Sequence, residues 1–208
     1  MLTIDNLSFF RGEKVIFKNL ALSVSTSSAI VITGKNGCGK SSLLKIIAGI
    51  YECNNGKIFW GNENIKDIRE DFNGDLQYLG HKNFLKPELT ILENINFYSK
   101  IHDTQMAISS ALNYFELSDY QNILVKNLSA GWQQRVLLAK LMACPATIWL
   151  LDEPSNHLDS YFKEKLKELI KIRIKDKGLI LLVTHDEYFF DLGAKLNLED
   201  FIPFPLNK

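Results

Sequence analysis

The chain has 208 residues, of which 46% are hydrophobic and 23% charged, a composition typical of a soluble globular protein. Lys and Arg total 24, as do Asp and Glu, and this zero net charge argues against a nucleic-acid binder, which usually carries a basic face. No apolar stretch approaches the ~20 residues that span a bilayer, and the N-terminus shows no signal segment, so we expect a cytosolic protein. The three cysteines, odd in number and without metal-ligand spacing, are expected to be free thiols.

The first part of the chain is rich in predicted strands. Hydrophobic patterning places them at Leu2–Leu7, at about residues 15–24 and at Ala29–Thr33, with turn residues between them. Two further strands are predicted at Lys57–Trp60 and Asp75–Leu79.

From about residue 88 the pattern becomes helical. Thr90 and Glu93 form a capping box that opens one helix, and a second helical face follows in residues 108–115. The remaining predicted elements are a helix over Trp132–Ala143 stopped by Pro145, a strand from Ile148, a helix over Tyr161–Lys175 and a strand over Leu179–Thr184. We therefore expect one domain, with an α/β core of residues 1–83 and 144–208 and a helical subdomain of about residues 84–143.

A nucleotide-binding loop is the most informative motif. Gly34–Ser41 fits G-x-x-x-x-G-K-[ST], and it lies between a predicted strand and a helix, which makes a chance glycine-rich turn a poor alternative. Backbone N–H groups of such a loop bind phosphate oxygens, the Lys40 ammonium reaches the β- and γ-phosphates, and the Ser41 hydroxyl ligates Mg²⁺. The residues expected to bind a nucleoside triphosphate here are Gly34, Lys35, Asn36, Gly37, Cys38, Gly39, Lys40, Ser41 and Ser42.

A second acidic motif complements the loop. The apolar run from Ile148 predicts a buried strand that ends in Asp152 and Glu153. We expect Asp152 to hold Mg²⁺ through its water shell and Glu153 to accept a proton from the attacking water. A strand that merely ends in solvent explains this pair alone equally well, but the phosphate loop makes the catalytic interpretation stronger.

Two further motifs give the chain a family resemblance. Residues 128–131, Leu-Ser-Ala-Gly, resemble the LSGGQ signature of ATP-binding cassette (ABC) ATPases, and Thr184-His185-Asp186 resembles their switch-histidine loop. The resemblance implies a P-loop NTPase core with an N-terminal antiparallel β subdomain and an inserted α-helical subdomain. It also implies a head-to-tail homodimer, with Ser129, Ala130 and Gly131 binding the partner's ATP and His185 orienting water with Glu153.

The chain departs from the ABC pattern at several positions. Trp132 stands at the usual Gln of the signature, and His81 stands where a Gln normally helps to coordinate Mg²⁺. At the adenine-stacking position the expected aromatic residue is replaced by Arg11, with Phe10 beside it. Either residue could stack on adenine, and core packing of Phe10 is an equal alternative.

The stretch from Leu79 to Tyr98 resembles the ATP-binding subunit of the haem exporter of cytochrome c maturation. This resemblance implies a subunit peripheral to the cytoplasmic face of the inner membrane, with integral membrane partners and no direct nucleic-acid contact. Two alternatives stay open. The segments 153–159 and 184–190 resemble ABC-F factors, which act on ribosomes, and a transporter ATPase for another cargo would share every motif except residues 79–98.

Two side-chain hypotheses depend on this scheme. Cys38 lies near a helix N-terminus and beside Lys40, so we expect a thiolate-prone group that lines the site, unless it is a buried small side chain that only fills space. Phe84 and Leu85 are expected on a loop surface that accepts a helix from a membrane subunit, unless they pack into the core of the helical subdomain.

Overall fold

The computed structural model describes residues 1–80, 84–101, 107–144 and 146–203. Four strands form an antiparallel sheet in the order β2-β1-β4-β5: β1 (Leu2–Arg11), β2 (Lys14–Val24), β4 (Asn55–Trp60) and β5 (Glu63–Asn64). A parallel sheet has the order β6-β7-β8-β3-β9: β3 (Ser28–Thr33), β6 (Leu76–Leu79), β7 (Ile148–Asp152), β8 (Leu179–Val183) and β9 (Ala194–Asn197).

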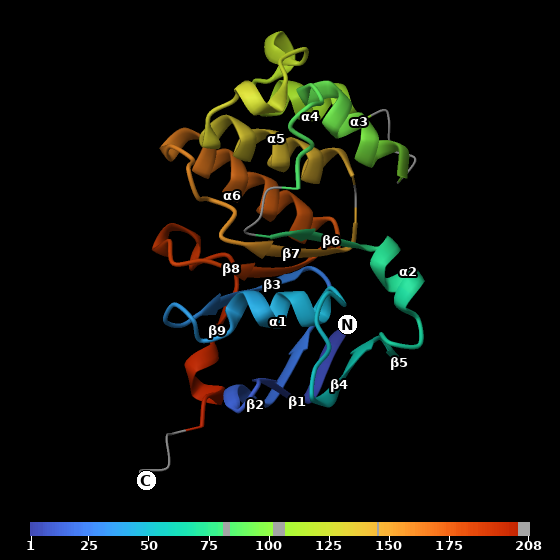
Figure 1. Cartoon of the computed structure of the whole chain (residues 1–208), viewed down its shortest axis with the longest axis vertical. Helices are drawn as coiled ribbons and strands as arrows, with labels where there is room; N and C mark the ends of the chain where they lie inside the picture. The colour runs from blue at the N-terminus through green and yellow to red at the C-terminus, as the bar shows by residue number, and fades with distance from the viewer. Residues whose placement is uncertain (81–83, 102–106, 145, 204–208) are drawn as a thin grey trace.

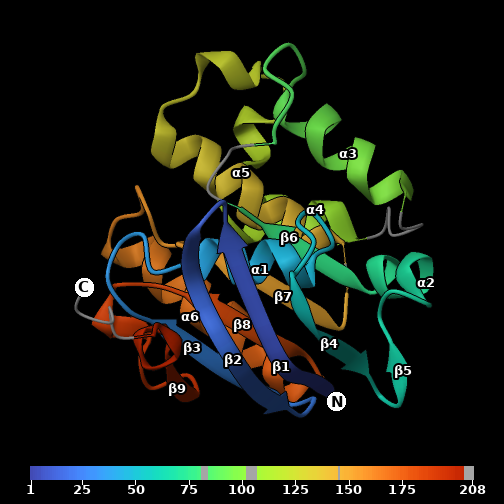
Figure 2. The same cartoon turned by 60° about the horizontal axis from the view of Figure 1, so that its bottom comes forward.

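Helices separate and cover the two sheets. The short helix α1 (Lys40–Ile47) lies between the parallel sheet and the antiparallel sheet, as Figures 1 and 2 show. The opposite face of the parallel sheet is covered by α5 (Ala130–Ala143) and α6 (Ser160–Lys175), and α3 (Ile91–Ile101) and α4 (Ile108–Tyr114) lie beyond them (Figure 1). The helix α2 (Arg69–Gly74) leads into β6. Within the described residues, no helix is both long and apolar enough to cross a membrane.

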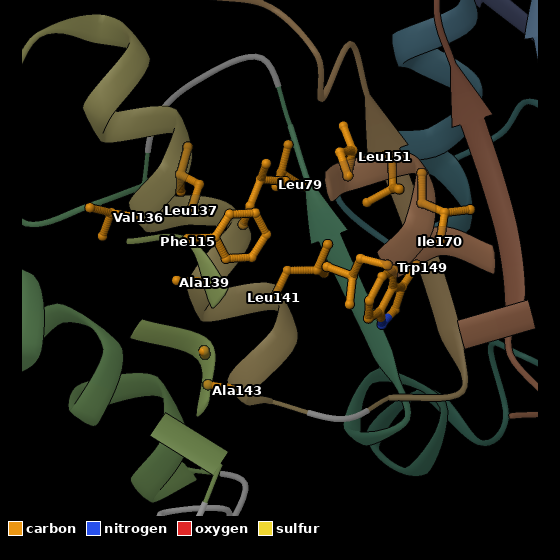
Figure 3. Packing of buried hydrophobic residues seen from close by; sticks show 14 of the residues in the cluster. Leu79, Phe115, Val136, Leu137, Ala139, Leu141, Ala143, Trp149, Leu151 and Ile170 are labelled. Atoms are coloured by element: carbon orange, nitrogen blue, oxygen red, sulfur yellow. The ribbon is translucent and has the colours of Figure 1, made fainter. Parts of the chain in front are cut away.

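The central strands are buried on both faces. Every residue of β7 and β8 is buried, which explains why each reads as an unbroken apolar run in the sequence. Along β7, Ile148 and Leu150 pack in the cluster that contains α1, whereas Trp149 and Leu151 pack in the cluster that contains α5 and α6. Figure 3 shows Leu137 and Leu141 of α5 lying toward Leu79 of β6 and Trp149 of β7.

Most predicted elements are present, with different ends. The capping box is confirmed, because the Thr90 N–H donates to Glu93 Oε2 at 2.8 Å and the Glu93 N–H donates to Thr90 Oγ1 at 3.2 Å. The strand predicted at Leu2–Leu7 continues to Arg11, and the helix predicted from Trp132 begins at Ala130. The predicted stop, Pro145, lies outside the described residues. The short elements α2, β5 and β9 were not predicted, because each is too short to show a period.

A buried arginine joins three helices. The Arg135 guanidinium, on α5, lies 4.0 Å from the ring centroid of Trp132 and 4.1 Å from that of Phe162 on α6. It donates to the Phe115 carbonyl at the end of α4 through two nitrogens, at 3.0 and 2.6 Å, and to the Glu116 carbonyl at 2.7 Å. Burial lowers the pKa of Arg135, but the neighbouring Glu116 carboxylate opposes this shift. The side chain therefore fixes the helical region onto α6.

We predict that Arg135→Met lowers the free energy of unfolding by about 1 to 3 kcal/mol, because it leaves the buried Phe115 carbonyl without its donors. Urea denaturation followed by circular dichroism measures this change. The control Lys175→Met alters an exposed residue near the end of α6 and should move the midpoint very little. Equal midpoints for the two variants would contradict the anchoring role.

Candidate nucleotide site

A cavity of about 660 Å³ opens at the carboxyl ends of the parallel strands β3, β7 and β8. In open parallel sheets, ligands bind outside this edge. Ten residues expected at the site line the cavity: Arg11, Asn36, Gly37, Gly39, Lys40, Ser41, Ser42, Asp152, Glu153 and His185. The structure therefore brings together the phosphate loop, the acidic strand end and the histidine loop, which are far apart in the sequence.

The phosphate loop is held in shape by glycine and by its own lysine. Gly39 has φ of +108°, and a Cβ added there would lie 2.5 Å from Ile16 Cγ2, so this position requires glycine. The Lys40 ammonium donates to the carbonyls of Gly34 at 2.6 Å and Lys35 at 3.1 Å. Lys40 is buried, so its charge lies inside the turn of the loop and faces the cavity.

Ser41 and Asp152 form a pair with the chemistry of a cation site. The Ser41 hydroxyl donates to Asp152 Oδ1 at 3.0 Å and links α1 to the end of β7. The other carboxylate oxygen, Oδ2, is buried and has no hydrogen-bond partner among the described residues. A hydroxyl and a free carboxylate oxygen are ligands that Mg²⁺ accepts, so these residues fit a magnesium ion.

Glu153 and His185 lie next to this pair. The Glu153 carboxylate accepts a hydrogen bond from the His185 N–H at 3.4 Å, and its Oε1 lies 3.6 Å from His185 Nε2. Burial raises the pKa of Glu153, although the His185 N–H and imidazole partly oppose this shift. A carboxylate with a raised pKa is a stronger base, which is what proton abstraction from water needs.

The hypothesis of a thiolate at Cys38 is wrong. The Cys38 side chain is buried in the core cluster below the loop, where its sulfur would lie 2.8 Å from a Cβ added at Gly34. Burial raises the pKa of the thiol and outweighs the lowering effect of Lys40. Cys38 therefore contributes its backbone to the phosphate loop, while its side chain packs in the core. The sequence motif does not fix the direction of this side chain, so the motif alone could not predict its burial.

At the adenine-stacking position the structure separates the two candidates. Arg11 lines the cavity, and its guanidinium lies 5.5 Å from the ring centroid of Tyr51, whose hydroxyl accepts from Arg11 at 3.4 Å. Among the described residues that line the cavity, Phe10 does not occur. The Tyr51 ring in turn stacks on Phe9 at 6.0 Å. The flat guanidinium of Arg11 therefore lies at the cavity edge on an aromatic support.

The signature residues Ser129, Ala130 and Gly131 lie at the start of helix α5. None of the three is among the described residues that line the cavity. The Ser129 side chain caps the helix by accepting from the Trp132 N–H at 3.4 Å. A Cβ at Gly131 would lie 2.8 Å from the His157 carbonyl, so this glycine permits close packing on the segment after Glu153. The Trp132 ring meets Tyr120 edge-on at 4.6 Å and covers Arg135.

The region that follows β6 gives a mixed result. His81 lies outside the described residues, and the nearby Gln77 side chain donates to the Cys144 carbonyl. Phe84 is 50% exposed, as expected for a binding surface, but Leu85 is 6% exposed. The expectation that both side chains are exposed is therefore wrong for Leu85, which packs in the cluster of the helical region.

Four cavity residues were not predicted: Ile16, Lys45, Asn156 and Val183. Lys45 lies one turn after Ser41 on α1, so helical spacing could have identified it. Asn156 follows Glu153 by three residues within the acidic motif. Ile16 comes from the β1–β2 hairpin, and no local signal in the sequence places it against Gly39.

Known proteins are similar to this chain in sequence over most of its length. The family described as ABC transporter matches residues 17–156. The "Cytochrome c biogenesis ATP-binding export protein CcmA" of Aliivibrio fischeri is 42% identical over 193 residues, which cover 92% of this chain and 95% of that protein. The protein of the same name from Rickettsia bellii is 38% identical and covers 90% of this chain and 94% of its own length.

A solved structure has the same fold. The dimeric post-hydrolysis state of the ATP-binding cassette MJ0796, bound to ADP and Pi, superposes with a TM-score of 0.84 at 27% identity. The match covers 95% of this chain and 94% of the other. The α/β architecture with one antiparallel and one parallel sheet is therefore that of ABC cassettes, as the sequence motifs predict. With the family match and the relatives above, the chain belongs to the ABC transporter family and is an ABC-type ATPase.

Proposed function

We propose that this ATPase drives haem export for cytochrome c maturation as the nucleotide-binding subunit of a membrane transporter. The observation that supports ATP use most directly is the cavity where Lys40, Ser41, Asp152 and Glu153 meet. The cargo is inferred from relatives that are named cytochrome c biogenesis export proteins and from the resemblance of residues 79–98.

In this proposal the ATP phosphates bind the backbone N–H groups of residues 34–42. The Lys40 ammonium, which now donates to two loop carbonyls, exchanges part of these contacts for the β- and γ-phosphates. Ser41 Oγ and the Asp152 carboxylate would hold Mg²⁺, which would supply positive charge beside the phosphates. Arg11 stacks on adenine at the cavity edge.

Hydrolysis in this scheme depends on Glu153 and His185. Glu153 takes the proton of the attacking water, because it is the partly buried carboxylate beside the Asp152 cation site. His185, 49% exposed at the cavity edge, orients this water and contacts the γ-phosphate. We assign His81 to the sensing of the same phosphate, from its position in the resemblance alone.

A second copy of the chain completes the site in the proposal. Ser129, Ala130 and Gly131 stand at the N-terminus of a 14-residue helix, whose first-turn N–H groups and dipole suit the γ-phosphate of a partner's ATP. The MJ0796 cassette bound to ADP and Pi is dimeric, which supports a dimer of this chain. The head-to-tail arrangement with two nucleotides is what the family resemblance implies.

The subunit is proposed to lie on the cytoplasmic face of the inner membrane, bound to integral membrane subunits. Exposed Phe84 and Phe97 provide apolar surface, and Lys86 lies 4.1 Å from the Phe97 ring centroid.

Two experiments distinguish haem export from the ribosome-binding alternative and from another cargo. Purification of the tagged protein from its native cells should bring membrane subunits, whereas ribosomal proteins would overturn the proposal. Deletion should abolish haem attachment to c-type cytochromes, and normal attachment would exclude this cargo.

We expect Glu153→Gln to bind ATP with near-normal affinity but to lose at least a hundredfold in turnover, because the general base is absent. The trapped protein should elute as a dimer with MgATP in size-exclusion chromatography. Burial raises the pKa of Glu153, so this base becomes protonated at a higher pH than an ordinary glutamate. As the pH is lowered, the wild-type rate should therefore begin to fall at a pH above the ordinary glutamate pKa of about 4.3.

The same variant also tests the burial of this carboxylate. A raised pKa in the folded state means that the ionised group costs stability, and this cost disappears as pH falls below the unfolded pKa. Nucleotide-free Glu153→Gln should therefore melt at or above the wild-type temperature near pH 7, with no advantage near pH 4. Turnover by Glu153→Gln close to the wild-type rate would refute the assignment of Glu153 as the general base.

Lys40→Ala should weaken ATP binding by at least tenfold, because the buried ammonium that faces the phosphates is lost. Isothermal titration with ATP measures the affinity. The matched control Lys18→Ala removes an exposed lysine from β2 and should leave the affinity unchanged. If both variants bind ATP as the wild type does, the cavity is not the nucleotide site.

Phe84→Ser should leave folding and ATP affinity intact and release the protein from membranes, because Phe84 is half exposed while Leu85 is buried. Membrane flotation and the level of haem-bearing c-type cytochromes are the measurements. Ile172→Ser is the control, since Ile172 is 57% exposed on α6. A Phe84→Ser protein that stays on membranes would place the docking surface elsewhere.

A further inference from the structure

Tyr78, which has no role in the proposed hydrolysis, lies near the cation site formed by Ser41 and Asp152. The Tyr78 hydroxyl and Asp152 Oδ2 are both buried, and neither has a hydrogen-bond partner among the described residues. One group is a donor at neutral pH and the other is an acceptor. Buried polar atoms of this kind are normally satisfied, often through a water molecule.

The strand register places both side chains on one face of the parallel sheet. Tyr78 of β6 pairs with Leu150 of β7, and Asp152 follows Leu150 by two residues, so the three side chains point the same way. Leu150 and Tyr78 pack in the cluster on the α1 side of the sheet. The Ser41 hydroxyl of α1 reaches Asp152 on this side, so Tyr78 approaches the carboxylate from the next strand.

The electrostatic relation agrees with this placement. Burial is the main cause that raises the pKa of Tyr78, and the charge of Asp152 is the second. The phenol therefore stays protonated and available as a donor. Ser41 already occupies Oδ1 of Asp152, which leaves Oδ2 as the acceptor.

Gly80 provides the space for the tyrosine ring. A Cβ added at Gly80 would lie 2.6 Å from both Cζ and the hydroxyl oxygen of Tyr78. The end of the ring thus lies against the backbone just after β6, and any larger residue at position 80 would displace it. The phenol thus occupies volume that a Cβ at position 80 would fill.

We propose that Tyr78 is a positioning residue, whose hydroxyl donates through one bridging water to Asp152 Oδ2 and fixes the carboxylate toward Ser41 and the bound cation. This role rests on the proposed function of Ser41 and Asp152 as the magnesium site. Groups that orient a ligand carboxylate in this way tune metal affinity without touching the metal or the nucleotide.

The test is Tyr78→Phe, which keeps the ring and removes the hydroxyl. Mn²⁺ affinity is measured by electron paramagnetic resonance with a non-hydrolysable ATP analogue, a readout independent of activity. We expect affinity to fall about tenfold, the low end for such partners. The analogue should bind normally without metal. The kcat of Tyr78→Phe should fall at low Mg²⁺, and raised Mg²⁺ should restore most of it. The urea midpoint of the nucleotide-free variant should not exceed that of the wild type.

Tyr114→Phe is the matched control, because its hydroxyl donates to the Lys165 carbonyl at 2.8 Å on the helical side of the molecule. It should lower the urea midpoint and leave Mn²⁺ affinity unchanged. Unchanged Mn²⁺ affinity in Tyr78→Phe, or a higher urea midpoint, would overturn the proposal, since a hydroxyl without any partner is better replaced by a hydrogen. If the wild type itself fails to bind the analogue, the proposed function fails instead.

Discussion

The register of the parallel sheet is the constraint on which the site depends. Ile32 of β3 and Asp152 of β7 both pair with Val183 of β8, so three strands end at one level. The phosphate loop, the acidic pair and the histidine loop leave from these ends, and the Ser41–Asp152 hydrogen bond spans the junction. A slip of one residue in β7 would turn Asp152 away from α1 and separate the cation ligands.

The sequence predicts the site where function needs a local backbone shape, and it fails where packing decides. Glycine spacing predicts the phosphate loop, and the apolar run from Ile148 predicts the strand that ends at Asp152 and Glu153. The structure places both at the cavity. The directions of Cys38 and Leu85 depend on clusters built from distant segments, so no local pattern reveals their burial. Ile16 reaches the cavity for the same reason, through a hairpin that folds back over Gly39.

Glu153 illustrates how chemistry and stability oppose each other in this site. Its backbone has φ of +52°, a conformation that side chains rarely adopt, and its carboxylate is largely buried next to Asp152. Both features cost free energy in the folded protein. The hydrogen bond from its own N–H to the Val183 carbonyl keeps the residue in place despite this cost, so the fold of the sheet maintains a base that the local chain disfavours.

The buried side chain of Asn94 has a consequence for binding at the proposed docking surface around exposed Phe84 and Phe97. Its amide accepts from the Lys86 N–H and donates to the carbonyls of Lys86, Leu89 and Thr90. Residues 86–90 are therefore ordered before any other protein arrives. The conformational entropy of this loop is lost during folding and not during association, so a partner that docks here meets a prepared surface and loses little affinity to ordering it.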